Sequence, residues 1–187
     1  RDVSDCRWEP GVLEVLDLAN VDMTTLPRGA VSAQAGRAAY EYIERAVTLA
    51  TREAIHGIVT APINKGALPP TGVTHSGHTE ILAELSGTRD YAMLLMGKEL
   101  KVIHVTTHVS LRRVPDLVTR ERVLRVIRLA RDTIVGLGRP EHRIAVAGLN
   151  PHAGEDGLFG DEEKLAITPA IEAARAEGMT VFGPIPG

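Results

Sequence analysis

The chain is poor in cysteine and in aromatic residues. Cys6 is the only cysteine among 187 residues, so no disulfide can form within the chain, and a reducing compartment fits this composition. Aromatic residues make up 3% of the sequence, so we expect a core of Ala, Val, Leu and Ile. No apolar run approaches the roughly 20 residues that span a bilayer, and the first residues show no basic region followed by an apolar one. These absences predict a soluble, cytoplasmic protein that contacts no membrane.

A strong charge of either sign is also missing. The formal net charge is −3, which gives no basic field for nucleic acid. Arginines crowd between Arg112 and Arg131, but the spacing predicts that a helix exposes most of them to solvent. We therefore expect no nucleic-acid partner.

Helical and extended patterns alternate along the chain. The apolar spacing predicts helices over residues 32–54, 78–87, 120–136 and 169–178, with Ser32, Thr119 and Thr168 at or next to helix starts. Short β-rich runs predict strands over residues 56–62, 91–97, 100–108, 143–150 and 179–187. This order predicts an α/β fold: a mostly parallel sheet with helices on both faces, plus one antiparallel hairpin.

The sequence signals are unevenly distributed along the chain. Residues 1–30 carry only scattered signals, whereas residues 31–187 hold every clear helix, strand and motif. Residues 63–77 have the Gly, Pro and Asn content of a long, ordered loop, and loops of this length are often functional.

Two predicted strands end on histidines. One strand ends at His108 and another at His152, and ligands of α/β sheets bind beyond the carboxyl ends of the strands. Imidazole is the commonest protein ligand for zinc and related ions. We predict that His108 and His152 bind one divalent metal ion, with ordinary loop histidines as the alternative.

A second group of candidates surrounds residue 78. His78 and Thr79 lie at a predicted helix start, where free N–H groups and the helix dipole favour an anionic or hydroxyl-rich ligand. They are our candidate substrate-binding residues, and Thr79 is also the expected N-cap. Lys65 follows a predicted strand and could meet a phosphate or carboxylate, so it is the candidate catalytic residue, with a plain surface lysine as the alternative.

Other polar residues near these positions have weaker patterns. His104 lies further inward than His108 on the same predicted strand, which favours a structural core histidine. Glu155 and Asp156 could orient a histidine or be merely exposed. A metal hydrolase with Glu155 as general base is a rival function. Neither a GxGxxG turn nor a P-loop lysine occurs, so no nicotinamide-binding residue is assigned.

Several segments resemble one enzyme family. The stretches "VTAPINKGAL", "SGHTEILAELSG", "VTTHVSLR", "AGLNPHAGEDGLFG" and "GPIP" occur in this order. Together they resemble the 4-hydroxythreonine-4-phosphate dehydrogenase (PdxA) family of vitamin B6 (pyridoxal phosphate) synthesis.

The resemblance implies a fold, a reaction and a partner. It implies a homodimer with a fold similar to isocitrate and isopropylmalate dehydrogenases. It also implies NAD- or NADP-dependent oxidation of the secondary alcohol of a 4-phosphorylated hydroxy acid, followed by decarboxylation of the keto acid. A divalent ion (Zn, Mg or Co) would be bound by His108 and His152, and substrate by His78 and Thr79.

The resemblance also leaves alternatives open. Family members have an N-terminal strand and a C-terminal segment with a third metal histidine, associated with the partner subunit, and this chain resembles their central part. We therefore expect the central part of a two-domain dehydrogenase, incomplete at both ends. The alternatives are a threonate or erythronate 4-phosphate dehydrogenase, an aromatic dihydrodiol dehydrogenase, or a truncated relative without catalytic activity.

Overall fold

The computed structural model describes residues 3–72, 77–140 and 143–186, and these form two compact units. Unit 1 spans Arg1–Arg89 and unit 2 spans Asp90–Gly187. Within the described residues, no helix is both long and apolar enough to cross a membrane.

Unit 1 is built on two helices. After a short turn, η1 (Val3–Asp5), residues 6–32 form no helix or strand. Helix α1 (Ala33–Thr51) follows, and its predicted N-cap is confirmed because Ser32 Oγ accepts from the N–H of Ala35 at 3.4 Å. Helix α2 (His78–Leu85) contacts α1.

The core of unit 1 lies between these helices and the chain that joins them. Turns η2 (Lys65–Ala67) and η3 (Pro69–Thr71) occupy the predicted long loop, of which residues 73–76 lie outside the described part. The buried core residues are Ile43, Val47, Leu68 and Ile81, with Tyr40, Ile58, Ile63, Leu82 and Leu85 packed around them.

A glycine in α1 permits the closest contact in this unit. A Cβ atom at Gly36 would lie 2.0 Å from the carbonyl oxygen of Ala67, which is far inside contact distance. Only a residue without a side chain lets the η2 turn approach α1 so closely. Gly36 therefore fixes the place of the turn that carries Lys65.

The strand predicted over residues 56–62 is wrong. These residues have no strand structure, and Val59 is fully exposed. The segment contains β-favouring residues, but a strand also needs a hydrogen-bonded neighbour, and no other described segment pairs with it.

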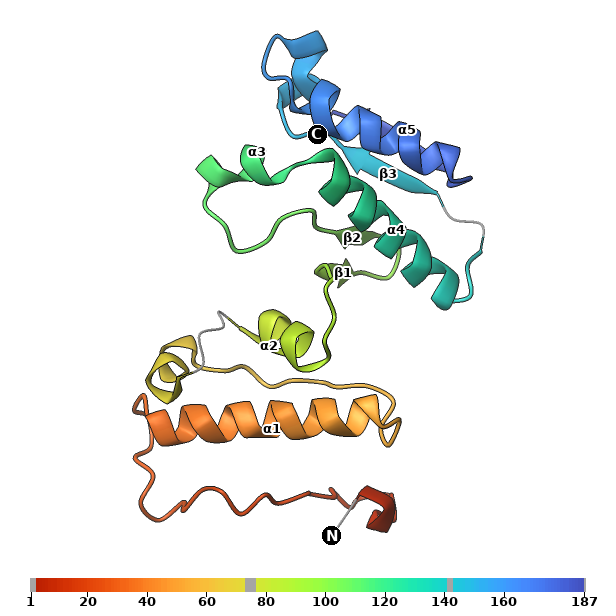
Figure 1. Ribbon diagram of the computed structural model, residues 1–187. Coiled ribbons are helices and arrows are strands. Elements are labelled where there is room, and N and C mark those ends of the chain that lie inside the picture. Colours follow the sequence, from red (N-terminus) through yellow and green to blue (C-terminus); the bar gives the residue numbers. More distant parts are fainter. Residues whose placement is uncertain (1–2, 73–76, 141–142, 187) are drawn as a thin grey trace. The chain divides into compact units, whose positions relative to one another are not determined.

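Unit 2 holds the strands (Figure 1). Strands β1 (Leu94–Met96) and β2 (Lys101–Ile103) form the predicted antiparallel hairpin, with Leu94 opposite Ile103. Turn η4 (Leu111–Arg113), α3 (Val114–Leu117) and α4 (Arg120–Gly136) follow. The predicted cap of α4 is confirmed, because Thr119 Oγ1 accepts from the N–H of Arg122 at 3.2 Å.

The last part of unit 2 is a parallel strand–helix–strand element. Strand β3 (Ile144–Ala147) leads into turn η5 (Pro151–Gly157), a π-helical turn η6 (Glu163–Ile167) and helix α5 (Thr168–Ala176). Strand β4 (Val181–Ile185) then pairs parallel to β3. Helix α5 begins at Thr168, as predicted, but Thr168 is not its N-cap, because the π-helical turn from Glu163 continues directly into α5 and places Ile167 at the N-cap.

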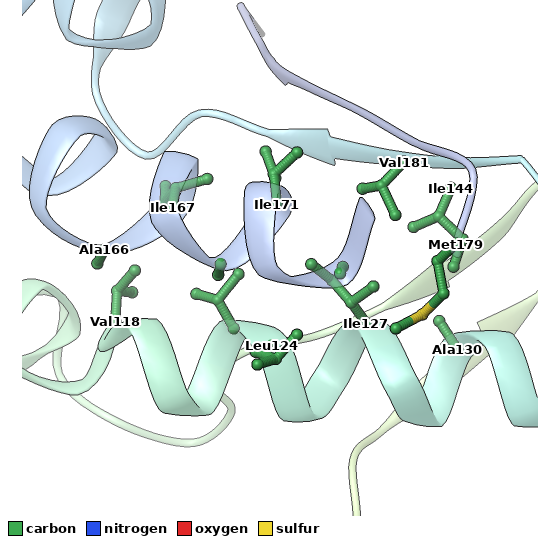
Figure 2. Close-up of a cluster of buried hydrophobic side chains, with 13 residues drawn as sticks. Val118, Leu124, Ile127, Ala130, Ile144, Ala166, Ile167, Ile171, Met179 and Val181 are labelled. Atoms are coloured by element: carbon green, nitrogen blue, oxygen red, sulfur yellow. The ribbon is translucent and has the colours of Figure 1, made fainter. Parts of the chain in front are cut away.

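Helix α5 packs between α4 and strand β4, and this contact forms the main core (Figure 2). The buried residues are aliphatic, as the low aromatic content predicts: Val118, Val123, Leu124, Ile127, Ala130, Ile144, Ala166, Ile167, Ala170, Ile171, Ala174, Met179 and Val181. Removing this apolar surface from water stabilises unit 2.

The α/β class is confirmed, but the predicted sheet is only partly present. The described strands form two separate pairs, β1–β2 and β3–β4, and only the second is parallel. A continuous, mostly parallel sheet covered on both faces would need further pairing that the described residues do not make. That larger sheet stays a prediction.

Candidate functional site

The side chain of Lys65, a residue of turn η2, lies next to the start of helix α2. The N-cap of this helix is Gly77, and a Cβ atom there would lie 3.8 Å from Lys65 Nζ. The ammonium group is exposed, and the η2 turn that carries it is fixed by Asn64, whose side chain accepts from the N–H of Gly66 at 2.9 Å. The structure thus brings Lys65 to the helix start that also carries His78.

The start of α2 has the chemistry of an anion-binding site. His78 and Thr79 are its first two residues and both are half-buried. Thr79 is therefore not the N-cap, contrary to our expectation, since the helix begins one residue earlier at His78. The free N–H groups of the first turn, the positive end of the helix dipole and the Lys65 ammonium all favour a negatively charged ligand.

His108 lies in unit 2, five residues beyond the end of β2. It is exposed and has a left-handed backbone, with φ of +56°. The preceding segment is fixed by Arg122 of α4, which donates from Nε to the carbonyl of Val105 at 2.9 Å and from both terminal nitrogens to the carbonyl of Tyr91 at 3.2 Å. Helix α4 therefore holds the backbone shortly before His108.

His104 has a different environment. It is half-buried, and its Nδ1 lies 3.4 Å from the carbonyl oxygen of Met93 on the neighbouring strand segment. This contact supports the interpretation of His104 as a structural histidine.

His152 lies just after β3, in turn η5. Its imidazole is exposed, and the ring centroid is 6.0 Å from that of Phe159. The turn is left-handed over five consecutive residues, from His152 (φ +53°) to Asp156 (φ +55°). Four of the five are not glycine, and each such residue costs roughly 1–2 kcal/mol in this conformation. The turn needs compensating contacts.

The strongest compensating contact comes from Glu163. This side chain is only 3% exposed. Its Oε1 accepts from the N–H groups of Leu149 and Asn150, both at 2.7 Å, and its Oε2 accepts from Asn150 Nδ2 at 2.9 Å. The carboxylate therefore binds the backbone at the point where β3 ends and the turn begins.

Glycines make room for this carboxylate. A Cβ atom at Gly154 would lie 2.7 Å from Glu163 Oε2, and one at Gly148 would lie 3.2 Å from Oε1. Burial raises the pKa of Glu163, but the hydrogen bonds from Asn150 and Leu149 outweigh it and hold the pKa below its ordinary value. The group is therefore a stable, ionised part of the turn.

The two candidate metal ligands flank one core. Ile103 and Val105, which precede His108, pack against the same hydrophobic cluster as Val146 and Leu149, which precede His152. Strands β2 and β3 belong to separate pairs, however, so the two histidines do not share an edge of one described sheet. That His108 and His152 bind one ion stays a prediction.

The two imidazoles are suitable ligands for a divalent cation, but a complete metal site needs further ligands. Neither imidazole makes a hydrogen bond to another described residue, so their ring nitrogens are available. Within residues 3–72, 77–140 and 143–186, no three His, Cys, Asp or Glu side chains gather as a metal site. The carboxylates of Glu155 and Asp156 are exposed and have no described hydrogen-bond partner, so an orienting role is not supported.

The sequence analysis missed Glu163 and Arg122. A signal for Glu163 was available, since it lies in register with the apolar stripe of Ile167, Ala170 and Ala174 and so falls on the buried face. Arg122 gave no such signal, because it occurs among arginines that are otherwise mostly exposed, such as Arg125.

The sequence matches the model of a known protein family. The sequence model of the family described as "Pyridoxal phosphate biosynthetic protein PdxA" matches residues 3–187. The chain belongs to the PdxA family. This assignment confirms the resemblance inferred from the motifs.

Relatives of this PdxA-family chain have named activities. It is 48% identical over 183 residues to D-threonate 4-phosphate dehydrogenase of Pectobacterium atrosepticum, covering 98% of the chain and 56% of the relative. It is 50% identical over 186 residues to 4-hydroxythreonine-4-phosphate dehydrogenase of Beijerinckia indica, covering 99% and 55%. The chain thus spans about half the length of the curated relatives it matches.

Solved structures agree with the sequence comparison. A putative 4-hydroxythreonine-4-phosphate dehydrogenase from Salmonella typhimurium superposes with a TM-score of 0.91 at 49% identity, covering 98% of this chain and 56% of that one. A terephthalate 1,2-cis-dihydrodiol dehydrogenase from Burkholderia xenovorans matches at a TM-score of 0.65 and 28% identity, covering 97% and 60%.

Proposed function

We propose that this chain is part of an NAD- or NADP-dependent dehydrogenase that oxidises the secondary alcohol of a 4-phosphorylated hydroxy acid. The observation that carries the proposal is identity of 48–50% over nearly the whole chain to dehydrogenases of such substrates. The fold would be similar to isocitrate and isopropylmalate dehydrogenases, and the protein would act as a cytoplasmic homodimer.

In this proposal the start of α2 binds substrate. Lys65 supplies a positive charge next to the free N–H groups of the first turn, where a phosphate or carboxylate is favoured. His78 and Thr79 hold the polar groups beside it. These residues bind and orient the substrate and stabilise its negative charge.

His108 and His152 would hold a divalent cation (Zn, Mg or Co), with a further ligand from outside the described residues. When bound, such an ion would supply Lewis-acid chemistry, stabilising negative charge on the substrate oxygen during oxidation and polarising the ketone for decarboxylation. This chain presents two exposed imidazoles on segments fixed by Arg122 and Glu163.

D-Threonate 4-phosphate is our first candidate for the substrate. Relatives with that activity in their names are 48% and 50% identical to this chain. A 4-hydroxythreonine-4-phosphate dehydrogenase is also 50% identical to it. 4-Hydroxythreonine 4-phosphate is therefore the second candidate, and erythronate 4-phosphate the third. Aromatic dihydrodiols rank lower, because that relative is 28% identical.

The test is an NADH-release assay on the full-length protein with these substrates, NAD and NADP, before and after treatment with a chelator. We expect turnover of one 4-phosphorylated hydroxy acid, loss of turnover on chelation and recovery with added Zn²⁺, Mg²⁺ or Co²⁺. His108→Ala and His152→Ala should abolish turnover and metal retention. The matched control is His56→Ala, which changes an exposed histidine of unit 1.

Three outcomes would contradict the proposal. Undiminished activity in both histidine variants would remove the metal from the mechanism. Turnover without a nicotinamide would favour a hydrolase. A folded protein that oxidises none of the substrates would favour a relative without catalytic activity.

A further inference from the structure

Glu163 is the only charged side chain that is buried in the described part of the chain. It makes no ion pair there. Instead, its two oxygens accept hydrogen bonds from one short segment, the N–H groups of Leu149 and Asn150 and the side-chain amide of Asn150. A buried carboxylate that accepts hydrogen bonds from a loop fixes the loop backbone, because any movement of the loop would leave the carboxylate without hydrogen-bond donors.

The next residue holds the other end of the same turn. Lys164 donates from Nζ to the carbonyl of Asp156. Glu163 and Lys164 both lie in the π-helical turn that opens α5, and such turns occur frequently at functional sites. Two consecutive residues of one helical turn therefore hold the beginning and the end of the left-handed segment.

The segment between these two anchors carries His152. The turn is closed by the N–H of Ala153, which donates to the carbonyl of Asn150 at 3.1 Å. Gly154 lies directly against Glu163, so close that a Cβ atom there would be 2.7 Å from Oε2. The direction of the His152 imidazole thus depends on a backbone that is packed around one carboxylate.

We propose that Glu163 is a positioning residue for His152: its carboxylate holds the left-handed turn in the conformation in which the imidazole binds a divalent cation. This inference rests on the proposed function. Glu163 does not touch the ion or the substrate. It acts by fixing the imidazole in advance, so that less conformational entropy is lost when the cation binds.

The test measures binding of Co²⁺ by the metal-free full-length protein, followed by the visible absorption of the bound ion. Loss of a direct contact to a metal ligand typically weakens metal binding roughly 10- to 100-fold, and we expect Glu163→Gln to weaken Co²⁺ binding by up to about 10-fold, because Glu163 acts through the backbone two residues before His152. Hydrogen exchange of the amides at Leu149 and Asn150 should accelerate in the same variant without any metal. That second readout is independent of activity.

Two controls separate positioning from general stability. Glu172→Gln makes the same chemical change at an exposed position of α5 and should leave both readouts unchanged. Ile171→Ala destabilises the core of unit 2 and leaves Glu163 in place, so its Co²⁺ affinity should stay that of the unchanged protein. If Glu163→Gln does not fold, Asn150→Ser removes only the side-chain amide and should weaken binding in the same direction.

The outcomes distinguish this inference from the proposed function. If the unchanged protein binds no Co²⁺ and releases no NADH, the proposed function fails. If it does both and the folded Glu163→Gln or Asn150→Ser variant binds Co²⁺ equally well, the positioning role is overturned. An equal loss of Co²⁺ affinity in Ile171→Ala would overturn it too.

Discussion

Glu163→Gln should destabilise unit 2 by about 2 kcal/mol near neutral pH. The carboxylate accepts three hydrogen bonds, at 2.7, 2.7 and 2.9 Å. An amide oxygen keeps the two backbone bonds, but each loses about 1 kcal/mol because the acceptor is no longer charged. The amide nitrogen of glutamine would face Asn150 Nδ2, so two donors meet and the third bond is lost. The smaller cost of burying a neutral group offsets part of this sum.

The destabilisation should depend on pH in a defined direction. Hydrogen bonds hold the pKa of Glu163 in the folded protein below its ordinary value of 4.5, so folding favours the ionised form. The contribution of Glu163 is therefore fully present above pH 4.5 and is lost as the pH falls through the lowered, folded-state pKa. Glutamine does not titrate, so the difference between the two proteins should shrink in acid.

Urea unfolding followed by circular dichroism, from neutral pH to about pH 3, measures this difference. Glu172→Gln is the control, because it makes the same chemical change at an exposed position of α5. A difference that stays constant down to the lowest pH at which the proteins fold would refute the reasoning, since it would mean that the charge of Glu163 contributes nothing.

Three further changes test other parts of the structure. Gly36→Ala places a Cβ atom against the carbonyl of Ala67 and should destabilise unit 1 by about 1–3 kcal/mol in thermal unfolding; unchanged stability would contradict the close approach. Ile171→Ala, at a side chain 1% exposed, should cost about 2–5 kcal/mol in urea unfolding, and a loss below about 1 kcal/mol would contradict its core position. Lys65→Met should raise KM for the phosphorylated substrate more than it lowers kcat, if the anion binds at the start of α2; an unchanged KM would place the anion elsewhere.

The features that the sequence predicted well are local ones. Helices α1 and α4 follow from apolar spacing, and their caps, Ser32 and Thr119, are confirmed because a cap contacts a backbone group only three residues away. The hairpin β1–β2 is also confirmed, since its strands are neighbours in the chain. Family membership followed from short motifs in order, which need no knowledge of contacts.

The features that the sequence predicted poorly depend on distant partners. Residues 56–62 have the composition of a strand, but pairing decides whether a strand forms, and composition does not reveal the partner. The meeting of Lys65 with the start of α2 depends on Gly36, about 30 residues earlier, which lets the η2 turn approach α1. Only Gly154 and Gly157 hint at a left-handed turn, and the non-glycine residues around them give no such signal.

The two candidate metal ligands share a structural arrangement that no sequence motif shows. His108 and His152 both have a left-handed backbone, with φ of +56° and +53°, a conformation that non-glycine residues rarely adopt. Such strain persists only where surrounding contacts impose it, and it gathers at functional sites. In both cases a charged side chain from a helical segment holds the backbone shortly before the histidine: Arg122 holds the carbonyl of Val105, and Glu163 holds the N–H of Asn150.

The opposite charges of the two anchors follow from the groups they bind. A guanidinium can satisfy carbonyl oxygens, and a carboxylate can satisfy N–H groups, so each helical segment supplies the charge that its neighbouring backbone lacks. Ordinary surface loops need no such support, because solvent can satisfy their backbone groups. Both histidine segments receive it from separate helical segments, and this arrangement motivates our proposal that His108 and His152 are functional residues, which the metal-binding experiment tests.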